Sequence, residues 1–285
     1  MNTHKSIWSD WLGVSLKQYY VNAGGVRTRV VEAGEGPPLL LVHGTGGHVE
    51  AYTRNLKGLS QHFRTIVYDM LGHGLTDSPD MPYTTDVLSN HQVALLDALG
   101  IEKAHLSGES LGGWVVAWTA AHHPERVDRL LLNTPGNVTS KPETLRVVRD
   151  STLQAVRDPT TANVRARLEF LFYDKSLVTD ELVAIRQAIY SQVGFLKAIE
   201  NTLVLQDPAI RKRYIWNPEW CGRITAPTLL VWTDHDPTGG LDEADLLLKW
   251  IPGSQLRVIY GAGHWPQWEK PEEFDEIHRT FLANN

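Results

Sequence analysis

Three side chains have the types and the chain order of a serine-hydrolase triad. Ser110 is the central residue of GESLG, residues 108–112, which fits the G-x-S-x-G pattern of a sharp strand-to-helix turn. An acid, Asp234 or Asp236, comes at the end of one apolar run typical of a strand, and His264 follows another. A serine hydroxyl becomes an effective nucleophile when an imidazole accepts its proton and a carboxylate orients that imidazole. The sequence therefore predicts that these three side chains meet.

Such a nucleophile also needs backbone N–H groups that stabilise the negative oxygen of its intermediate. Leu111 follows the serine at the start of a predicted helix, where N–H groups point outward and favour negative charge. The loop HGTGG, residues 43–47, follows another strand-like run, and its Thr45 is the second expected donor. Thr45 and Leu111 are thus the predicted oxyanion hole.

Short apolar runs bounded by turn residues alternate with helical patterns through most of the chain. Because ligands of open α/β sheets bind at the carboxyl ends of the strands, this alternation predicts where the triad is held. Expected strands are 38–44, 63–69, 103–108, 127–136, 227–234 and 255–263, expected helices are 50–60, 84–99, 111–122 and 242–250, and 17–34 is expected to form an antiparallel hairpin.

The alternation stops between the fourth and fifth of these expected strands. Residues 136–224 show helical patterns, with helices expected from Ser140 and Pro142 onward, over 161–173 and from Thr179 onward. We therefore expect a mostly parallel, doubly wound α/β sheet formed by 1–135 and 225–285, with 136–224 inserted as a helical lid.

Composition excludes several classes of function. The chain has 285 residues, 27 basic against 33 acidic, and no block of like charges that would favour nucleic acid or an anionic membrane. Its first 20 residues contain no continuous apolar stretch of the length that a signal peptide needs, so we expect none. No apolar run reaches about 18 residues, so we expect no membrane span. The one cysteine, Cys221, is expected to be buried and fits a reducing, cytoplasmic location. Phosphate-loop, dinucleotide-loop and H-E-x-x-H patterns are missing, so no cofactor or metal is expected.

Two further segments resemble a particular family. Residues 263–274 read GHWPQWEKPEEF and residues 173–190 read YDKSLVTDELVAIRQAIY, both similar to motifs of the meta-cleavage product hydrolases. That resemblance implies the α/β-hydrolase fold and cleavage of a carbon–carbon bond in a 2-hydroxy-6-oxo-dienoate, a small molecule from aromatic degradation. It further implies that Arg186 binds the dienoate end of the substrate and that Trp265 lines the same pocket. Family precedent suggests self-association into a homo-oligomer.

Arg186 is also conspicuous without the family. On a helix that starts near residue 180, Leu182, Ile185, Ile189 and Val193 form one apolar stripe, and at about 100° per residue Arg186 falls within it. A permanent cation on a buried stripe needs an anionic partner. That partner is a substrate or a local carboxylate such as Asp180 or Glu200. Alternatively, the arginine side chain extends to solvent and needs no partner.

The polar contacts of the substrate are less well defined by the sequence. The resemblance places Gly44, Gly46 and His48 near the substrate, with Asn137 as a further polar candidate. Glu109 occupies the position before the nucleophile, where many members of the family have a neutral Asn.

Two choices stay open at this level. The triad acid is Asp236 or Asp234, and the family's spacing after the strand Trp232 favours Asp236. The same triad and lid would also suit a serine esterase or lactonase, or a slow-turnover protein that senses a ligand.

Overall fold

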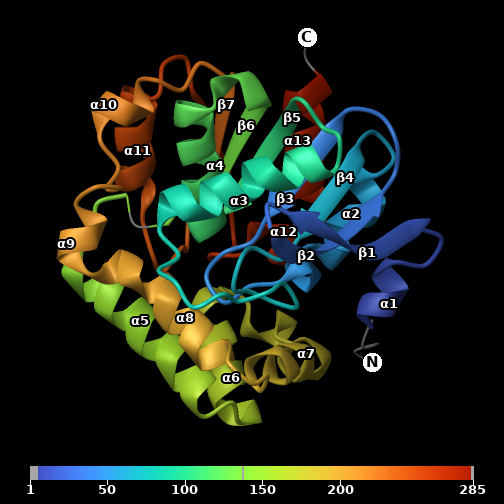
Figure 1. Cartoon of the computed structure of the whole chain (residues 1–285), viewed down its shortest axis with the longest axis vertical. Coiled ribbons are helices and arrows are strands. Elements are labelled where there is room, and N and C mark those ends of the chain that lie inside the picture. Colours follow the sequence, from blue (N-terminus) through green and yellow to red (C-terminus); the bar gives the residue numbers. More distant parts are fainter. Residues whose placement is uncertain (1–5, 137, 284–285) are drawn as a thin grey trace.

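The computed structural model describes residues 6–136 and 138–283. An eight-stranded sheet in the order β1-β2-β4-β3-β5-β6-β7-β8 runs through the centre of the molecule (Figure 1). The strands are β1 (Leu16–Ala23), β2 (Val26–Ala33), β3 (Pro38–Val42), β4 (Arg64–Tyr68), β5 (Ala104–Glu109), β6 (Val127–Asn133), β7 (Thr228–Thr233) and β8 (Gln255–Ile259).

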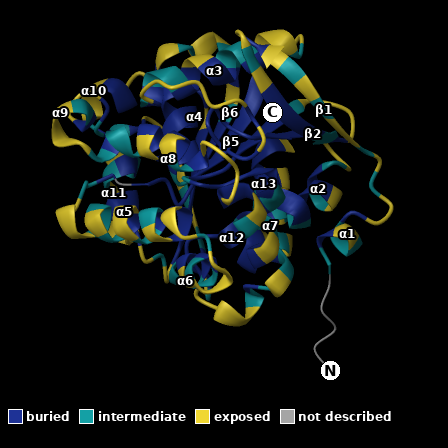
Figure 2. Ribbon diagram, turned by 60° about the horizontal axis from the view of Figure 1, so that its bottom comes forward, coloured by how far each residue is buried: buried dark blue, intermediate teal, exposed yellow. Residues whose placement is uncertain are grey.

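The sheet is mostly parallel, as the sequence predicts. Strands β1 and β2 form the expected antiparallel hairpin, and β2 pairs antiparallel with β4. All other neighbours pair in parallel. Every residue of β5 and of β7 is buried, because helices cover both faces of the sheet (Figure 2).

Successive residues of the central strand β3 feed two separate hydrophobic clusters. Leu40 and Val42 belong to the cluster that includes α3 and α4, whereas Leu39 and Leu41 belong to the cluster that includes α2 and α13. The helices outside the lid are α1 (Ile7–Asp10), α2 (Thr53–Leu59), α3 (Thr85–Ala98), α4 (Leu111–His122), α11 (Leu241–Trp250), α12 (Pro266–Glu269) and α13 (Pro271–Ala283), with 3-10 turns η1 (Val49–Tyr52) and η2 (Pro124–Arg126).

Between the end of β6 and the start of β7, the described residues form helices and no strand. Figure 1 shows α5 to α8 packed together at one end of the molecule, with α9 beside them and α10 farther away, next to α11. These elements are α5 (Pro142–Arg157), α6 (Thr161–Leu171), α7 (Asp180–Tyr190), α8 (Phe195–Leu203), α9 (Pro208–Arg211) and α10 (Pro218–Cys221), with 3-10 turns η3 (Lys175–Leu177) and η4 (Val204–Gln206).

Several predicted boundaries were wrong. The strand expected over 255–263 ends at Ile259, because Gly261 has a φ of 66° and turns the chain. The helix expected over 50–60 is a 3-10 turn followed by α2. Val193, expected on the apolar stripe, lies beyond the end of α7 and is fully exposed. Helix α8 was not predicted, although its buried face includes Ala198 and Ile199.

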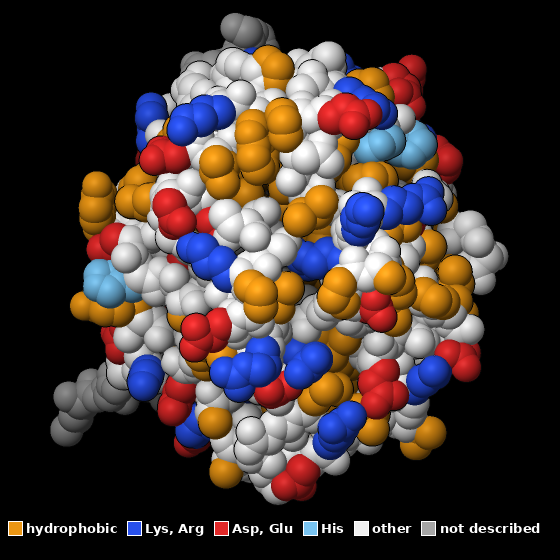
Figure 3. All heavy atoms as spheres, turned by 90° about the vertical axis from the view of Figure 1, so that its left-hand side faces the viewer, with side chains coloured by type: hydrophobic (Ala, Val, Ile, Leu, Met, Phe, Trp, Pro, Cys, Tyr) orange, Lys and Arg blue, Asp and Glu red, His pale blue; other side chains and the backbone are white. Residues whose placement is uncertain are grey.

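The face that carries α5 and α9 is basic at its centre. Figure 3 shows Lys and Arg side chains gathered there around hollowed, partly apolar surface. No helix in 6–136 or 138–283 is both long and apolar enough to cross a lipid bilayer.

Candidate active site

Ser110 lies at the turn between β5 and α4, and its backbone is strained. Its φ of 54° and ψ of −118° lie in a region that side chains rarely adopt, as expected for a nucleophile held clear of a sheet. The turn depends on glycine: a Cβ at Gly112 would lie 2.3 Å from the carbonyl oxygen of Val42. The G-x-S-x-G segment therefore lets α4 start directly against the end of β3.

His264 and Asp236 come together at the carboxyl ends of β8 and β7. Nδ1 of His264 lies 3.0 Å from each carboxylate oxygen of Asp236. Thr238 fixes this carboxylate, since its backbone N–H and its hydroxyl both donate to Oδ1 at 2.8 Å. The hydroxyl of Thr238, which the sequence did not suggest, also lies 3.0 Å from Nδ1. Asp236 thus has the position that orients a triad imidazole.

Asp234, the other carboxylate considered, lies elsewhere. Its Oδ1 accepts the N–H of Gly261 at 2.8 Å and lies 2.8 Å from Nδ1 of His235. It therefore stabilises the turn after β8 and does not contact His264 within the described residues.

The other imidazole nitrogen of His264 faces a carboxyl group that precedes the serine. Nε2 lies 3.2 Å from Oε1 of Glu109, and the second oxygen, Oε2, accepts the N–H of Gly44 at 2.8 Å. The sequence predicts a direct contact between His264 and Ser110, but the described residues contain no hydrogen bond between the serine hydroxyl and Nε2. Glu109 and Ser110 therefore compete for the same nitrogen.

Burial and charge shift the protonation of this pair. Burial raises the pKa of Glu109 to about 7, although His264 and the Gly44 N–H act in the opposite direction. Burial alone would lower the pKa of His264, but Asp236 and Glu109 outweigh it, so that this pKa is raised above its ordinary value. Both shifts favour the protonated form of each group.

The backbone N–H groups of Thr45 and Leu111 lie beside Ser110 and have no hydrogen-bond acceptor among the described residues. Both residues line the cavity in front of Ser110. Gly136 lines the cavity next to these two residues. Its N–H donates to the carbonyl of Ser110 at 3.0 Å, and a Cβ on it would lie 3.4 Å from the serine hydroxyl. The arrangement can stabilise a negative oxygen at the serine.

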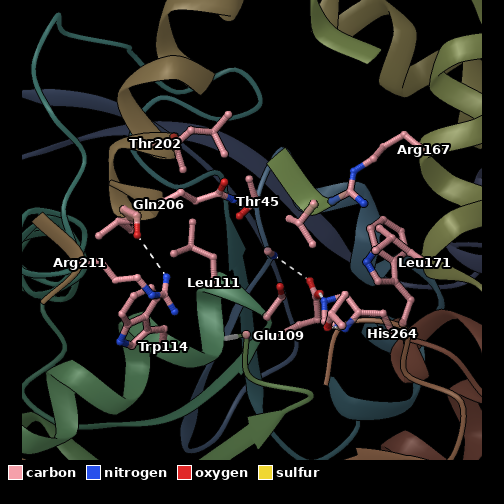
Figure 4. Close-up of a pocket in the computed structure, with 18 residues that line it drawn as sticks. Thr45, Glu109, Leu111, Trp114, Arg167, Leu171, Thr202, Gln206, Arg211 and His264 are labelled. Carbon is pink, nitrogen blue, oxygen red and sulfur yellow. Dashed lines mark hydrogen bonds and ion pairs between the residues drawn. The ribbon is translucent and has the colours of Figure 1, made fainter. Parts of the chain in front are cut away.

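The cavity lies between the sheet and the lid (Figure 4). The wall that carries the reactive groups belongs to the core and includes Ser110, Glu109 and His264. The opposite wall, here called the roof, belongs to the lid. The roof consists of Val148 from α5, Arg167 and Leu171 from α6, Thr202 and Leu203 from α8, Leu205 and Gln206 from η4, and Arg211 from α9. A substrate in this cavity would contact both parts of the chain.

Comparison with known proteins identifies the family. Residues 37–271 match the family model of the alpha/beta hydrolase fold. The chain is 35% identical to a 2-hydroxymuconate semialdehyde hydrolase of Pseudomonas sp. (strain CF600), over 92% of each chain. Its structure is similar to that of a meta-cleavage product hydrolase from Pseudomonas fluorescens IP01, with a TM-score of 0.82 over 93% of this chain and 98% of that one. The two sequences are 32% identical. The chain belongs to the meta-cleavage product hydrolases of the α/β-hydrolase fold.

A third relative is likewise similar over most of its length. The chain is 31% identical to a 2-hydroxy-6-oxononadienedioate/2-hydroxy-6-oxononatrienedioate hydrolase of Comamonas testosteroni, over 90% of this chain and 92% of that one. Family membership accounts for the elbow, the sheet and the inserted helices together.

Arg186 of the hydrolase is buried on α7, where the sequence expects it, with 1% of its surface exposed. Its guanidinium carbon lies 4.9 Å from the ring centre of Trp265 and 5.7 Å from that of Tyr190. Its Nε and Nη2 atoms are buried and have no hydrogen-bond partner in the described part of the chain. Trp265 lines the cavity of Ser110, and Arg186 lies against it without lining that cavity itself.

The remaining predicted binding residues of the hydrolase divide into two groups. Gly44 lines the cavity, whereas Gly46 and His48 do not. Gly46 accepts a hydrogen bond from the Tyr190 hydroxyl at 3.2 Å, and Nδ1 of His48 lies 2.7 Å from Glu50. Burial lowers the pKa of His48, although Glu50 opposes this, and its Nε2 is buried without a partner among the described residues. Asn137 lies outside the described residues.

Arg167 of the hydrolase was missed by our sequence analysis, although the signal that drew attention to Arg186 also applies to it. It lies among Val164, Leu168 and Leu171, which form the buried stripe of α6. No group of three or more His, Cys, Asp or Glu side chains in 6–136 and 138–283 is arranged to hold a metal ion.

Proposed function

We propose that this hydrolase cleaves the C5–C6 bond of 2-hydroxy-6-oxo-hexa-2,4-dienoate-type products of aromatic ring cleavage. One structural observation carries the proposal: a serine-hydrolase constellation lies next to a buried arginine, Arg186, that has no anionic partner among the described residues. Esters need no such cation, whereas a dienoate has a permanent carboxylate. The names of the relatives support the same substrate class.

The first step is a tautomerisation. A proton leaves the 2-hydroxyl group and a proton is added at C5, so that the substrate becomes a 2-oxo compound that can accept electrons. Arg186, which lies against Trp265 and does not line the cavity as it stands, binds the carboxylate and the 2-oxo end once Trp265 gives the substrate access to it, and its charge then favours the negative oxygen formed on the way. Trp265, stacked on this guanidinium, fixes its orientation.

The second step is attack by Ser110. For this, Nε2 of His264 must turn from Glu109 to the serine hydroxyl, and a protonated, neutral Glu109 releases it more readily than a charged one. His264 accepts the serine proton while the hydroxyl oxygen bonds to C6. The N–H groups of Thr45 and Leu111 stabilise the resulting oxyanion.

The third step breaks the carbon–carbon bond. The oxyanion collapses, the C5–C6 electron pair is delocalised onto the 2-oxo group, and His264 returns its proton to give 2-hydroxypentadienoate. Water, deprotonated by His264, then attacks the acyl group on Ser110, and the serine recovers its hydrogen. The proton transfers of the second and third steps are accounted for by His264 and water.

The test is direct, because such dienoates are yellow. We expect catalytic amounts of the purified enzyme to bleach a 2-hydroxy-6-oxo-dienoate faster than they hydrolyse a simple aryl ester. Ser110→Ala should lower turnover by about 10⁴-fold or more and still bind the dienoate, as followed by its absorbance. Persistent colour, or faster turnover of the ester, would contradict the proposal.

We also propose that the enzyme acts in the cytoplasm. The single cysteine, Cys221, is buried and reduced, which suits a reducing compartment. Fractionation of the producing cells, followed by dienoate turnover in each fraction, tests this location.

A further inference from the structure

Arg167 is a buried cation that faces the nucleophile's cavity. It is 4% exposed and lines the cavity together with Ser110 and His264 (Figure 4). It forms no hydrogen bond or ion pair with the described residues, and its Nη1 atom is fully buried. Burial lowers the pKa of Arg167 to about 10, so it remains charged at neutral pH. A charge in this position is stable only with an anion beside it.

The carboxylates of the site form no ion pair with Arg167 within the described residues, although Glu109 acts on it at longer range in the direction that raises its pKa. Asp236 is engaged by His264 and Thr238, and Glu109 by His264 and the Gly44 N–H. The dienoate carboxylate pairs with Arg186, which lies behind Trp265. Arg167 is therefore a second cation that a substrate with one carboxylate leaves unmatched.

Arg211 provides a contrast within the same cavity. Its Nε donates to the Ser140 hydroxyl at 2.7 Å and its Nη1 to the Leu205 carbonyl at 3.2 Å. Its guanidinium carbon also lies 4.8 Å from the ring centre of Trp114. Arg211 thus has hydrogen-bond partners on the lid, as buried arginines usually do, whereas Arg167 has none in the described part of the chain and only lies 5.6 Å from the ring centre of Phe170.

The approach to the cavity is also basic. A groove on the lid shares Gln206 and Arg211 with the cavity, and it lies on the face shown in Figure 3. Its remaining lining is Ser140, Pro142, Leu145, Arg146, Arg149, Pro208, Lys212 and Ile215. Three exposed cations and no acidic side chain among these residues would attract a substrate with more than one negative charge.

We propose that Arg167 binds an acidic group carried on C6, so that the preferred substrates are dienoates with two carboxylates, one at each end. This inference rests on the proposed function, because it assigns the second end of the same substrate. Cleavage would then yield 2-hydroxypentadienoate and a dicarboxylic acid. The reaction that supplies such a substrate must be the oxidative ring cleavage of a catechol with an acidic side chain.

The test compares two dienoates that differ in one charge. One carries a 2-carboxyethyl group on C6, and the other carries the uncharged 2-carbamoylethyl group of nearly equal size. We expect the wild-type enzyme to favour the acid over the amide in kcat/KM by about 100-fold, as for other buried charge pairs.

Four variants then identify the source of this preference. Arg167→Met should lower kcat/KM for the acid by about 100-fold and leave the amide within a few-fold, and Arg167→Lys should restore part of the loss. Leu171→Met, one helical turn away in the same cavity, should keep the preference because it changes no charge. Arg186→Met should weaken both substrates alike, because both have the dienoate carboxylate.

Each outcome decides a separate point. Equal wild-type rates on acid and amide would overturn the role of Arg167 while the proposed function stands. An equal loss on both substrates in a folded Arg167→Met protein, checked by circular dichroism, would overturn it as well, because Arg167 would then serve the dienoate carboxylate. If neither dienoate is turned over, the proposed function itself fails.

Discussion

The edge of the sheet and the lid handle charge in opposite ways. At the sheet edge, Asp236 contacts His264, and Glu109 contacts both His264 and the Gly44 N–H. In the lid, Arg167 and Arg186 are buried without an ion pair among the described residues. The charged groups of the catalytic half are therefore paired before a substrate arrives, although Nε2 of His264 still faces Glu109 and not Ser110, whereas the recognition half lacks its anions. This difference indicates that specificity depends on the anionic groups of the substrate.

The largest effect should come from breaking the catalytic half. Asp236→Asn keeps the shape of the side chain but removes the charge that holds the Nδ1 proton of His264, so kcat should fall by about 10³–10⁴-fold. Asp234→Asn is the matched control two residues away. Its carboxylate accepts the Gly261 N–H and does not contact His264, so its kcat should stay within a few-fold. Equal losses in the two variants would show that the triad acid is misassigned.

A smaller effect should come from the carboxyl group of Glu109, the residue before the nucleophile. Glu109 raises the pKa of His264, so Glu109→Gln should lower that pKa. Because His264 must be neutral to accept the serine proton, the acidic limb of the kcat/KM profile should move to lower pH. A profile from pH 5 to 9 measures the shift.

Glutamine at position 109 keeps an oxygen for the Gly44 N–H, so a purely structural role of Glu109 would change rate or stability without this shift. An acidic limb that stays in place or moves to higher pH would contradict the competition between Glu109 and Ser110 for Nε2.

The smallest effect should come from the basic groove. Replacing exposed Arg146 and Lys212 by Ser should lower kcat/KM by about 3–10-fold at low ionic strength, and the loss should vanish in concentrated salt because steering is screened. The control replaces Lys17 and Lys249, which lie outside the groove, and changes the net charge equally. A loss that persists in salt, or one shared by the control, would contradict substrate steering.

The sequence was most informative where backbone geometry determines residue type. The elbow around Ser110 needs glycine, and the alternation of strands and helices predicted the sheet, because both are local properties. It also placed Asp236 and His264 at strand ends, where parallel strands bring distant residues together.

The sequence was least informative where contacts depend on how side chains pack. Nothing local indicated that Glu109 would face Nε2 of His264, or that Thr238 would brace Asp236. Arg167 could have been found from the buried stripe of α6, as Arg186 was from that of α7. Val193 was misplaced because the apolar pattern was extended past the end of α7.

The lid is inserted between two neighbouring parallel strands, after β6 at Asn133 and before β7 at Thr228. Asn133 lies opposite Glu109, at the sheet edge that carries Ser110, whereas Thr228 lies opposite Leu130, toward the other edge. Selection can exchange or reshape the intervening helices without disturbing the nucleophile, and an engineer can graft the lid of a relative at these same junctions. New substrate specificities can then arise through changes in the lid alone, while the triad and its reaction stay the same.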